Sequence, residues 1–213
     1  MPNTIAHASS MNLIILEGPD GVGKTTQAQK LAAHMRAKLV VQPSGDNALG
    51  FLRPVVKTQK DIDPFARQLL HTCSHIVDAY QDFGPHNPTI VMDRCYASAL
   101  VYGSLTQLKP EYITLLRKIH QHVYTPLIEQ HGYHIHYIQL QAENSLRVSE
   151  KKADVYESAI SWQQTTEAYK HLFEHLTAQA PLFTPDENRH LVDVSGMNEE
   201  KVFKKICAIC EYA

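Results

Sequence analysis

The 213-residue sequence has no long hydrophobic run, no excess of charge of one sign and few cysteines. A membrane-spanning helix needs about 20 consecutive apolar residues, and the sequence contains no such stretch. Its 20 Lys and Arg residues nearly balance 22 Asp and Glu residues, so the formal net charge is −2. A near-neutral chain has no basic field that would attract nucleic acid or anionic lipid. We therefore expect a small-molecule ligand, with no nucleic-acid or membrane partner.

The first ten residues lack the basic start and apolar centre of a secretory signal. We expect a cytoplasmic protein in which residues 1–10 are a disordered extension, because the first convincing structural pattern begins at Met11. A chain of this length suits one core and is too short for two ordinary domains and a linker. Residues 11–213 are therefore predicted to form a single domain.

The four cysteines do not form a convincing metal or redox motif. Cys207 and Cys210 make one C-x-x-C, without a second pair or a neighbouring ligand cluster. They fall three residues apart on the apolar face of a predicted C-terminal helix, so buried thiols are the favoured interpretation. The thirteen histidines are scattered, and no metal cluster is expected among them.

Residues 18–25 read G-P-D-G-V-G-K-T, a match to the phosphate-binding pattern G-x-x-x-x-G-K-[ST]. An apolar run precedes the motif and a helical pattern follows it, which is the context that a phosphate loop requires and a chance glycine turn lacks. Lys24 is expected to reach the β- and γ-phosphates of a nucleotide, and Thr25 to ligate the accompanying Mg²⁺. The candidate nucleotide-binding residues are Gly18, Pro19, Asp20, Gly21, Val22, Gly23, Lys24, Thr25 and Thr26.

The remaining pattern alternates strands with helices. Apolar runs that suit strands lie at residues 12–17, 38–42, 89–93, 134–140 and 190–194. Helical periodicity covers residues 27–38, 64–83, 110–130, 144–176 with a break, and 198–212. This alternation predicts an α/β fold with a five-stranded parallel sheet flanked by helices. Ligands of such sheets bind beyond the carboxyl ends of the strands.

A carboxylate and a guanidinium follow the third predicted strand. Asp93 stands where it can hold Mg²⁺ through the ion's water shell, and Arg94 suits a second phosphate because it can donate two parallel N–H groups. Taken alone, the pair also fits a surface ion pair that ends a strand. The phosphate loop at the same sheet edge favours the functional interpretation.

These motifs resemble the thymidylate kinase family. Its pattern E-G-x-D-G-x-G-K-T-T compares with E-G-P-D-G-V-G-K-T-T at residues 17–26. D-R-Y-x-x-S-x-x-A-Y compares with D-R-C-Y-A-S-A-L-V-Y at residues 93–102, and D-x-Y-E with D-V-Y-E at residues 154–157. The matches follow in order across roughly residues 12–210, which is more specific than any one motif.

The resemblance implies a P-loop kinase with three α/β/α layers and a helical lid at about residues 143–157. It implies ATP as co-substrate, Mg²⁺ and a homodimer. Catalytic cations are expected in the lid, as Arg147, Lys151 or Lys152, because Gly21 stands where some members carry arginine in the phosphate loop. Glu150 occupies a lid position that often carries arginine, so the lid has less positive charge than usual.

The resemblance also implies an acceptor site for a deoxynucleoside monophosphate. Asp20 is expected near the sugar and phosphate, Arg94 on the phosphate, and Tyr102 beneath the deoxyribose, where it would disfavour a 2′-hydroxyl. Core packing for Tyr102 and a surface helix for Tyr156 are the alternatives to substrate contact. The implied acceptor-site residues are Asp20, Pro43, Arg53, His71, His75, Arg94, Ser98, Tyr102 and Tyr156.

The sequence departs from the family pattern where the base is expected. His71 replaces a phenylalanine that stacks on thymine, and His75 replaces an arginine. Imidazole can still stack and still donate a hydrogen bond, but it is shorter than arginine and not reliably charged near neutral pH. The expected acceptor is dTMP, and a modified or different deoxynucleotide such as 5-hydroxymethyl-dUMP is the alternative hypothesis.

Two other functions compete with transfer of the ATP γ-phosphate to a monophosphate. A deoxynucleoside kinase would need a general base for a hydroxyl acceptor, for which Glu17 or Asp93 is available in principle. A nucleotide switch would need a guanine-reading N-K-x-D and a D-x-x-G at the usual distance, and neither occurs. The D-R and D-x-Y-E motifs favour the monophosphate kinase.

Overall fold

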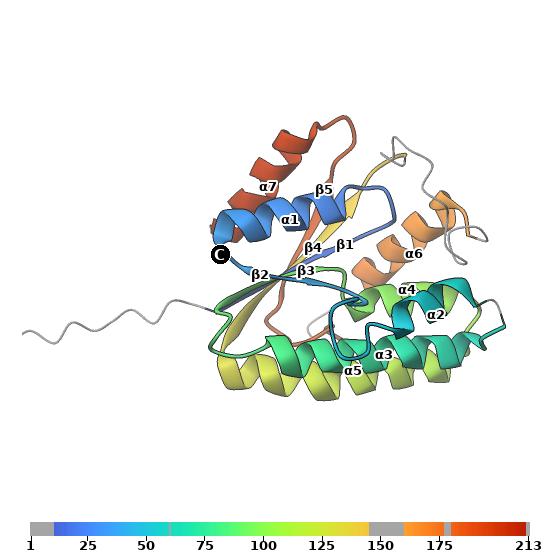
Figure 1. Cartoon of the computed structure of the whole chain (residues 1–213). Coiled ribbons are helices and arrows are strands. Elements are labelled where there is room, and N and C mark those ends of the chain that lie inside the picture. The colour runs from blue at the N-terminus through green and yellow to red at the C-terminus, as the bar shows by residue number, and fades with distance from the viewer. Residues whose placement is uncertain (1–10, 60, 145–159, 177–179, 212–213) are drawn as a thin grey trace, which may run out of the picture.

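A computed structural model describes residues 11–59, 61–144, 160–176 and 180–211 (Figure 1). The expected N-terminal extension and nearly all of the expected lid, with Arg147, Glu150, Lys151, Lys152 and Tyr156, lie outside these residues. Five parallel strands form one sheet in the order β2-β3-β1-β4-β5. They are β1 (Met11–Glu17), β2 (Lys38–Val41), β3 (Thr89–Asp93), β4 (Tyr133–Gln141) and β5 (Asn188–Asp193). The predicted five-stranded parallel sheet is confirmed.

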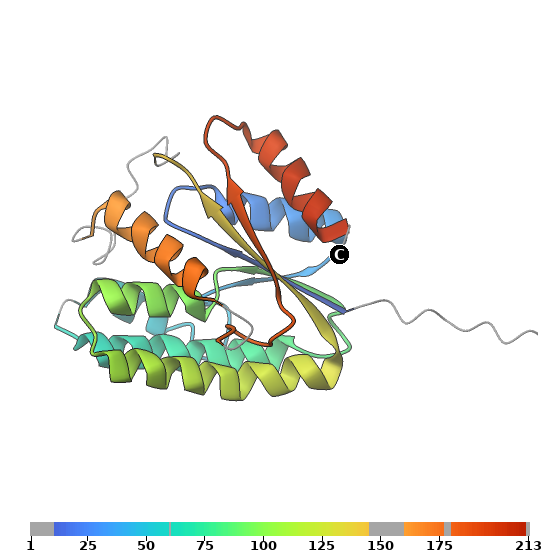
Figure 2. The same ribbon diagram turned by 180° about the vertical axis from the view of Figure 1, so that it is seen from behind.

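Helices cover both faces of this sheet (Figures 1 and 2). One face carries α1 (Lys24–Met35) and α7 (Glu199–Glu211). The other carries α2 (Leu52–Thr58), α3 (Pro64–Asp82), α4 (Tyr96–Leu105), α5 (Pro110–His131) and α6 (Trp162–His175). The arrangement confirms the three α/β/α layers.

Hydrophobic periodicity did not predict α2 and α4. Helix α2 has only seven residues, too few to display a period. Helix α4 is buried on most sides, with Tyr96, Ala97, Ala99, Leu100, Val101 and Gly103 all inside. A helix that is buried on most sides lacks the broad solvent-exposed polar face that creates a clear 3.6-residue pattern.

Two hydrophobic cores lie on opposite faces of the sheet. Leu13 and Ile15 of β1 point into the core formed with α3, α4 and α5, whereas Ile14 and Leu16 point into the core with α1 and α7. Successive side chains of a strand alternate between faces. A strand buried on both faces therefore reads as a continuous apolar run, which is why β1 was recognisable in the sequence.

The C-terminal cysteines lie on the inner side of α7. Val202 and Ile206 are buried there, while Cys207 and Cys210 are only partly buried against the same core. The prediction of buried thiols is therefore met only in part.

Among the described residues, no helix combines the length and the apolar character needed to cross a membrane.

Gly18 allows the phosphate loop to pass close to β4. Its φ of +135° is rarely adopted by L-residues, and a Cβ placed there would lie 2.2 Å from the Leu140 carbonyl oxygen. Gly132, at the end of α5, has a φ of +70°, but a Cβ at this position would meet nothing within 4 Å. Gly18 is thus constrained by both conformation and space, and Gly132 by conformation alone.

We expect Gly18→Ala to lower the free energy of unfolding by roughly 3–5 kcal/mol, because the added methyl group collides with backbone. The matched control Gly132→Ala should cost only about 1–2 kcal/mol, the penalty of a left-handed residue. Urea unfolding followed by circular dichroism measures both values. Equal losses in the two variants would show that contact with Leu140 does not constrain the loop.

Candidate functional site

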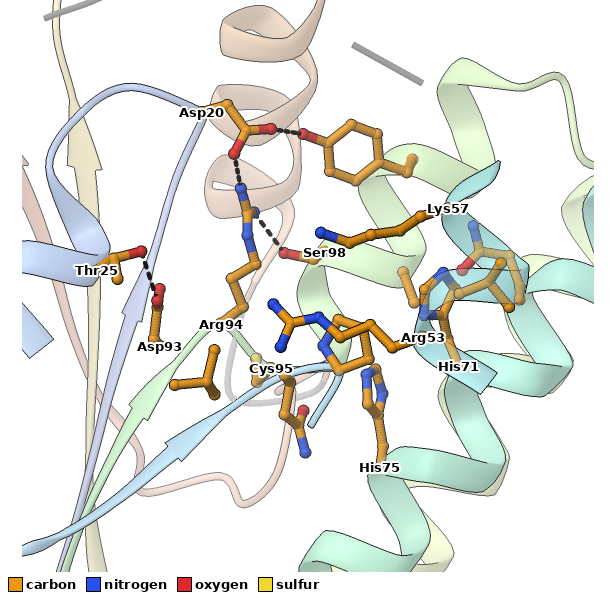
Figure 3. Close-up of a pocket in the computed structure, with 17 residues that line it drawn as sticks. Asp20, Thr25, Arg53, Lys57, His71, His75, Asp93, Arg94, Cys95 and Ser98 are labelled. Carbon is orange, nitrogen blue, oxygen red and sulfur yellow. Dashed lines mark hydrogen bonds and ion pairs between the residues drawn. The ribbon is translucent and has the colours of Figure 1, made fainter. Parts of the chain in front are cut away.

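A cavity of about 380 Å³ opens at the carboxyl edge of the sheet (Figure 3). The phosphate loop, the ends of β2 and β3, and helices α2, α3 and α4 contribute to its wall. Eight of the nine predicted acceptor-site residues line it, and the ninth, Tyr156, lies outside the described residues. The eight are Asp20, Pro43, Arg53, His71, His75, Arg94, Ser98 and Tyr102.

The phosphate loop turns sharply into α1. Gly21 and Gly23 adopt positive φ values of 84° and 90°, which glycine tolerates without strain. Lys24 is buried, and its Nζ donates a hydrogen bond to the Pro19 carbonyl oxygen at 2.6 Å. The lysine therefore lies folded over the loop, at the N-terminus of the helix that would face a phosphate.

The surrounding protein destabilises the charged form of Lys24. Burial, followed by repulsion from Arg94, lowers the pKa of Lys24 from 10.5 to about 7, although Asp20, Asp93 and Glu17 oppose the shift. A phosphate group at the loop would supply the missing negative charge. The site is therefore electrostatically incomplete without an anion.

Thr25 and Asp93 meet at the edge where a nucleotide-bound cation is expected. Thr25 Oγ1 donates to Asp93 Oδ2 at 2.6 Å, and Asp93 Oδ1 is buried with no hydrogen-bond partner among the described residues. Hydroxyl and carboxylate oxygens suit Mg²⁺. In the described ranges, no group of three His, Cys, Asp or Glu side chains is placed to hold a metal ion by itself. The donor set fits an ion held largely by nucleotide phosphates.

Arg94 lies at the centre of a polar network under the cavity (Figure 3). Its Nη1 donates to Ser98 Oγ and to Tyr169 Oη, both at 2.9 Å, and its Nη2 pairs with Asp20. Tyr102 completes the network by donating its hydroxyl to Asp20 Oδ2 at 2.5 Å. Arg94 therefore pairs with the phosphate-loop carboxylate, and the alternative of a simple Asp93–Arg94 surface pair does not describe it.

Glu17 has a structural role in this network that the sequence did not reveal. Its carboxylate is fully buried and accepts hydrogen bonds from Cys95 N at 2.7 Å, Ser98 N at 3.2 Å and Tyr169 Oη at 3.0 Å. Gly18 N adds a longer contact at 3.3 Å. Both oxygens are engaged, so Glu17 is a support for the loop and α4 and is not placed to act as a general base.

The sequence alone did not identify several cavity residues, Lys57 and Gln68 among them, or the supporting residue Tyr169. Lys57 follows Arg53 by one turn of α2, and both side chains extend toward Arg94 and Ser98 (Figure 3). Their i, i+4 spacing could have identified the pair if α2 had been recognised. Gln68 lines the cavity from α3. Tyr169 of α6 lies far along the chain from its partners, and no local pattern could have identified it.

The two cavity histidines are held as neutral rings. Burial, followed by Arg67 and Lys57, lowers the pKa of His71 to about 4. Burial, followed by His120 and His71, lowers the pKa of His75 well below its ordinary value of 6.5. Neither ring can replace the positive charge of an arginine near neutral pH.

Comparison with known proteins adds a family and relatives. The sequence model of the family described as thymidylate kinase matches residues 16–183. The thymidylate kinase of Bifidobacterium longum strain DJO10A is 32% identical over 117 residues, which are 48% of this chain and 57% of that protein. The probable thymidylate kinase of Methanosphaera stadtmanae is 29% identical over 119 residues, or 49% of this chain and 60% of that protein. The chain thus spans little more than half the length of these curated relatives.

Solved structures show the same fold at low identity. A thymidylate kinase from Candida albicans superposes with a TM-score of 0.66 at 22% identity, covering 95% of this chain and 92% of that one. One from Ehrlichia chaffeensis gives 0.65 at 15% identity, with coverages of 95% and 99%. A deoxyadenosine kinase from M. mycoides with bound dCTP gives 0.61 at 14%, with coverages of 94% and 100%. The fold is shared by kinases of different acceptors and does not by itself select one.

Nucleotide binding should recharge Lys24. At pH 8 a lysine with a pKa of about 7 is about nine-tenths neutral, and nucleotide phosphates favour its ammonium form. We therefore expect the protein to take up close to one proton when it binds ATP at pH 8. Calorimetric titrations in buffers of different ionisation enthalpy measure this uptake. Lys24→Met should abolish it and Lys30→Met, on the side of α1 that pairs with α7, should not. Equal uptake in all three proteins would contradict the assignment.

Replacing the buried carboxylate should loosen the whole network. Glu17→Gln puts an amide N–H₂ against groups that are themselves donors, so we expect the free energy of unfolding to fall by about 3 kcal/mol. Glu129→Gln, on the exposed surface of α5, is the matched control and should change it by less than about 0.5 kcal/mol. Urea denaturation provides the measurement. A wild-type midpoint for Glu17→Gln would rule out the supporting role.

Proposed function

Because the chain belongs to the thymidylate kinase family, we propose that it transfers the γ-phosphate of ATP to a deoxynucleoside monophosphate, with dTMP as the expected acceptor. The observation that carries the proposal is the continuity of one cavity from the phosphate loop to the Asp20–Arg94–Tyr102 network. The arrangement supports one phosphate at the backbone of the loop and a second phosphate at Arg94 beside it. A kinase that joins two phosphorylated molecules needs both.

Positioning and charge neutralisation supply the catalysis. Phosphoryl transfer needs little covalent chemistry from the protein, because the acceptor phosphate is already nucleophilic once its repulsion from ATP is offset. We assign Lys24, folded over the phosphate loop, to the donor phosphates, and Arg94 to the acceptor phosphate. Arg53 and Lys57 line the same cavity. These cations hold the two phosphates in line while an oxygen of the acceptor phosphate bonds to the γ-phosphorus. The bond between that phosphorus and the β–γ bridging oxygen breaks, and ADP leaves.

Mg²⁺ would be held by Thr25 and Asp93 together with the ATP phosphates, and would neutralise charge on the transferred group. We propose that lid cations, as Arg147, Lys151 or Lys152, close over the reacting phosphates and exclude water. Tyr156 would border the acceptor from the same segment. The homodimer and the cytoplasmic location remain predictions.

Preference for a deoxyribose is assigned to Tyr102. Its hydroxyl is fixed by Asp20, and the Arg94 guanidinium carbon lies 6.0 Å from its ring centroid. A ring whose hydroxyl is anchored and which a guanidinium approaches forms a wall beside the proposed acceptor phosphate. Such a wall disfavours an added 2′-hydroxyl by steric exclusion.

The site supports a monophosphate acceptor better than a nucleoside hydroxyl. A hydroxyl acceptor needs a general base within hydrogen-bond reach. Both oxygens of Glu17 already accept hydrogen bonds, and Asp93 accepts one from Thr25 at the expected cation position. Glu17 is therefore occupied by its protein partners, and the remaining oxygen of Asp93 is assigned to the cation and not to a nucleoside hydroxyl.

The test is a coupled assay of ADP formation with ATP and dTMP. We expect Lys24→Ala to lower kcat at least about 1,000-fold while the circular dichroism spectrum remains that of the wild type. Lys30→Ala, on the same helix and paired with Glu199 and Glu200 at the surface, should keep full activity.

The alternative functions give different outcomes in the same assay. ADP release without any acceptor would identify a nucleotide-hydrolysing module, and turnover of thymidine in place of dTMP would identify a nucleoside kinase. Full activity of Lys24→Ala would remove the proposed donor site.

A further inference from the structure

We propose that His75 selects the base of the acceptor by accepting a hydrogen bond from a base N–H, and that His120 fixes the His75 tautomer that makes this possible. The proposal rests on the proposed function, since it takes the cavity to be the acceptor site. His75 would be the residue that reads the base. His120, which does not line the cavity, would be a positioning residue.

The argument starts from a carbonyl group that can only accept. His120 Nδ1 lies 2.7 Å from the Leu116 backbone oxygen, one turn earlier on α5. A carbonyl oxygen has no hydrogen to give, so His120 Nδ1 must carry one. In a neutral imidazole the other nitrogen is then an acceptor. The Nε2 atom of His120 therefore presents a lone pair.

That lone pair faces His75. His75 Nδ1 lies 3.2 Å from His120 Nε2, in a contact that joins α3 to α5. Because His120 Nε2 accepts, His75 Nδ1 must donate. The hydrogen of a neutral His75 is thus on Nδ1, and its Nε2 is left as an acceptor.

The surroundings support this arrangement at the His120 ring and at the His75 backbone. Tyr96 stacks on His120 with ring centroids 4.4 Å apart and planes at 12°. Tyr124 donates its hydroxyl to the His75 backbone oxygen at 2.9 Å. Burial also keeps the rings neutral, since it lowers the pKa of His120 to about 4. The direction of the two hydrogen bonds is therefore fixed near neutral pH.

The Nε2 acceptor of His75 is available to a ligand in the cavity. The ring lines the cavity below Arg53 (Figure 3). Within the described part of the chain, Nε2 makes no hydrogen bond to protein and is not sealed among protein atoms. A neutral His75 ring offers the cavity one acceptor and no charge, which favours a ligand that offers a donor at this position.

A thymine or uracil ring carries such a donor, the imide N3–H, between two carbonyl oxygens. An arginine at position 75 would behave in the opposite way, because a guanidinium can only donate and would select a base carbonyl. His75 therefore reverses the polarity of the contact. We assign the N3–H of a thymine-type base as its partner, and the exocyclic amine of cytosine is the other source of the same chemistry.

Analogues of dTMP separate the two polarities. 4-Thio-dTMP weakens the carbonyl acceptor at position 4 but keeps N3–H, whereas N3-methyl-dTMP removes the N–H. We expect kcat/KM for 4-thio-dTMP to stay within about 3-fold of dTMP, and that for N3-methyl-dTMP to fall roughly 50-fold or more. His75→Arg should invert the pattern, with a large loss on 4-thio-dTMP.

The opposite pattern in the wild-type protein would overturn the proposal, because it would mean that position 75 reads a carbonyl group. A higher kcat/KM for dCMP than for dTMP would support the acceptor role of His75 and identify the amine as the donor. Equal use of dTMP, N3-methyl-dTMP and dCMP would also overturn the proposal.

The role of His120 is tested by separating KM from kcat. His120→Leu should raise KM for dTMP about 10-fold with kcat nearly unchanged, because His75 loses the partner that fixes its tautomer. His120→Gln keeps a side-chain acceptor and should restore part of the loss. His122→Leu, two residues away on the exposed side of α5, is the matched control. A kcat loss without a change in KM would contradict the assignment.

Nitrogen-15 NMR of the histidine rings tests the relay without any turnover. We expect His75 and His120 each to carry hydrogen on Nδ1 and a bare Nε2, and addition of dTMP to shift the His75 Nε2 signal toward that of a hydrogen-bonded acceptor. An Nε2–H form of His75 would overturn the proposal even if the kinase assay succeeds. Absence of kinase activity with an Nδ1–H signal that responds to dTMP, but not to N3-methyl-dTMP, would count against the proposed function alone.

Discussion

The buried carboxylate of Glu17 is the interaction on which the site depends. An ionised carboxylate inside a protein is costly unless hydrogen bonds replace its water. Here the replacements come from backbone at Gly18, Cys95 and Ser98 and from the hydroxyl of Tyr169. Satisfying one charge therefore requires the phosphate loop, the start of α4 and helix α6 to meet at one point.

Arg94 is placed as a consequence. Its backbone lies between β3 and the Cys95 amide that Glu17 holds, and its φ of +72° directs the chain out of the strand. The guanidinium then reaches Ser98 and Tyr169, two residues that themselves contact Glu17. A cation fixed by its supports before the ligand arrives loses little freedom when a phosphate binds, which is the physical basis of preorganised electrostatic catalysis.

The sequence predicted those parts of the molecule that depend on residues close together in the chain. The phosphate loop and the strand β1 that precedes it are short continuous signals, and the sheet followed from apolar runs buried on both faces. Helix α4 is buried on most sides, and its polar residues Ser98 and Tyr102 face the site, so it shows little amphipathic periodicity. The support from Tyr169, 152 residues beyond Glu17, depends on chain topology and not on any neighbouring pattern. The acceptor-site residues came from ordered resemblance to a family, and the structure brings eight of them into one cavity.

The hydrogen-bonding direction of His75 shows why residue type alone does not determine whether a side chain donates or accepts a hydrogen bond. A histidine at position 75 can donate or accept, and the sequence gives no preference between the two tautomers. The choice is made by His120, 45 residues away on α5, and ultimately by the Leu116 carbonyl group, which can only accept. In the proposed kinase, donor-side chemistry is thus tied to a loop that many nucleotide-binding proteins share, whereas the proposed choice of base is tied to helix packing behind the cavity. On this proposal, substitutions that leave every ligand contact in place still change which base is accepted when they alter the hydrogen-bond direction between α3 and α5.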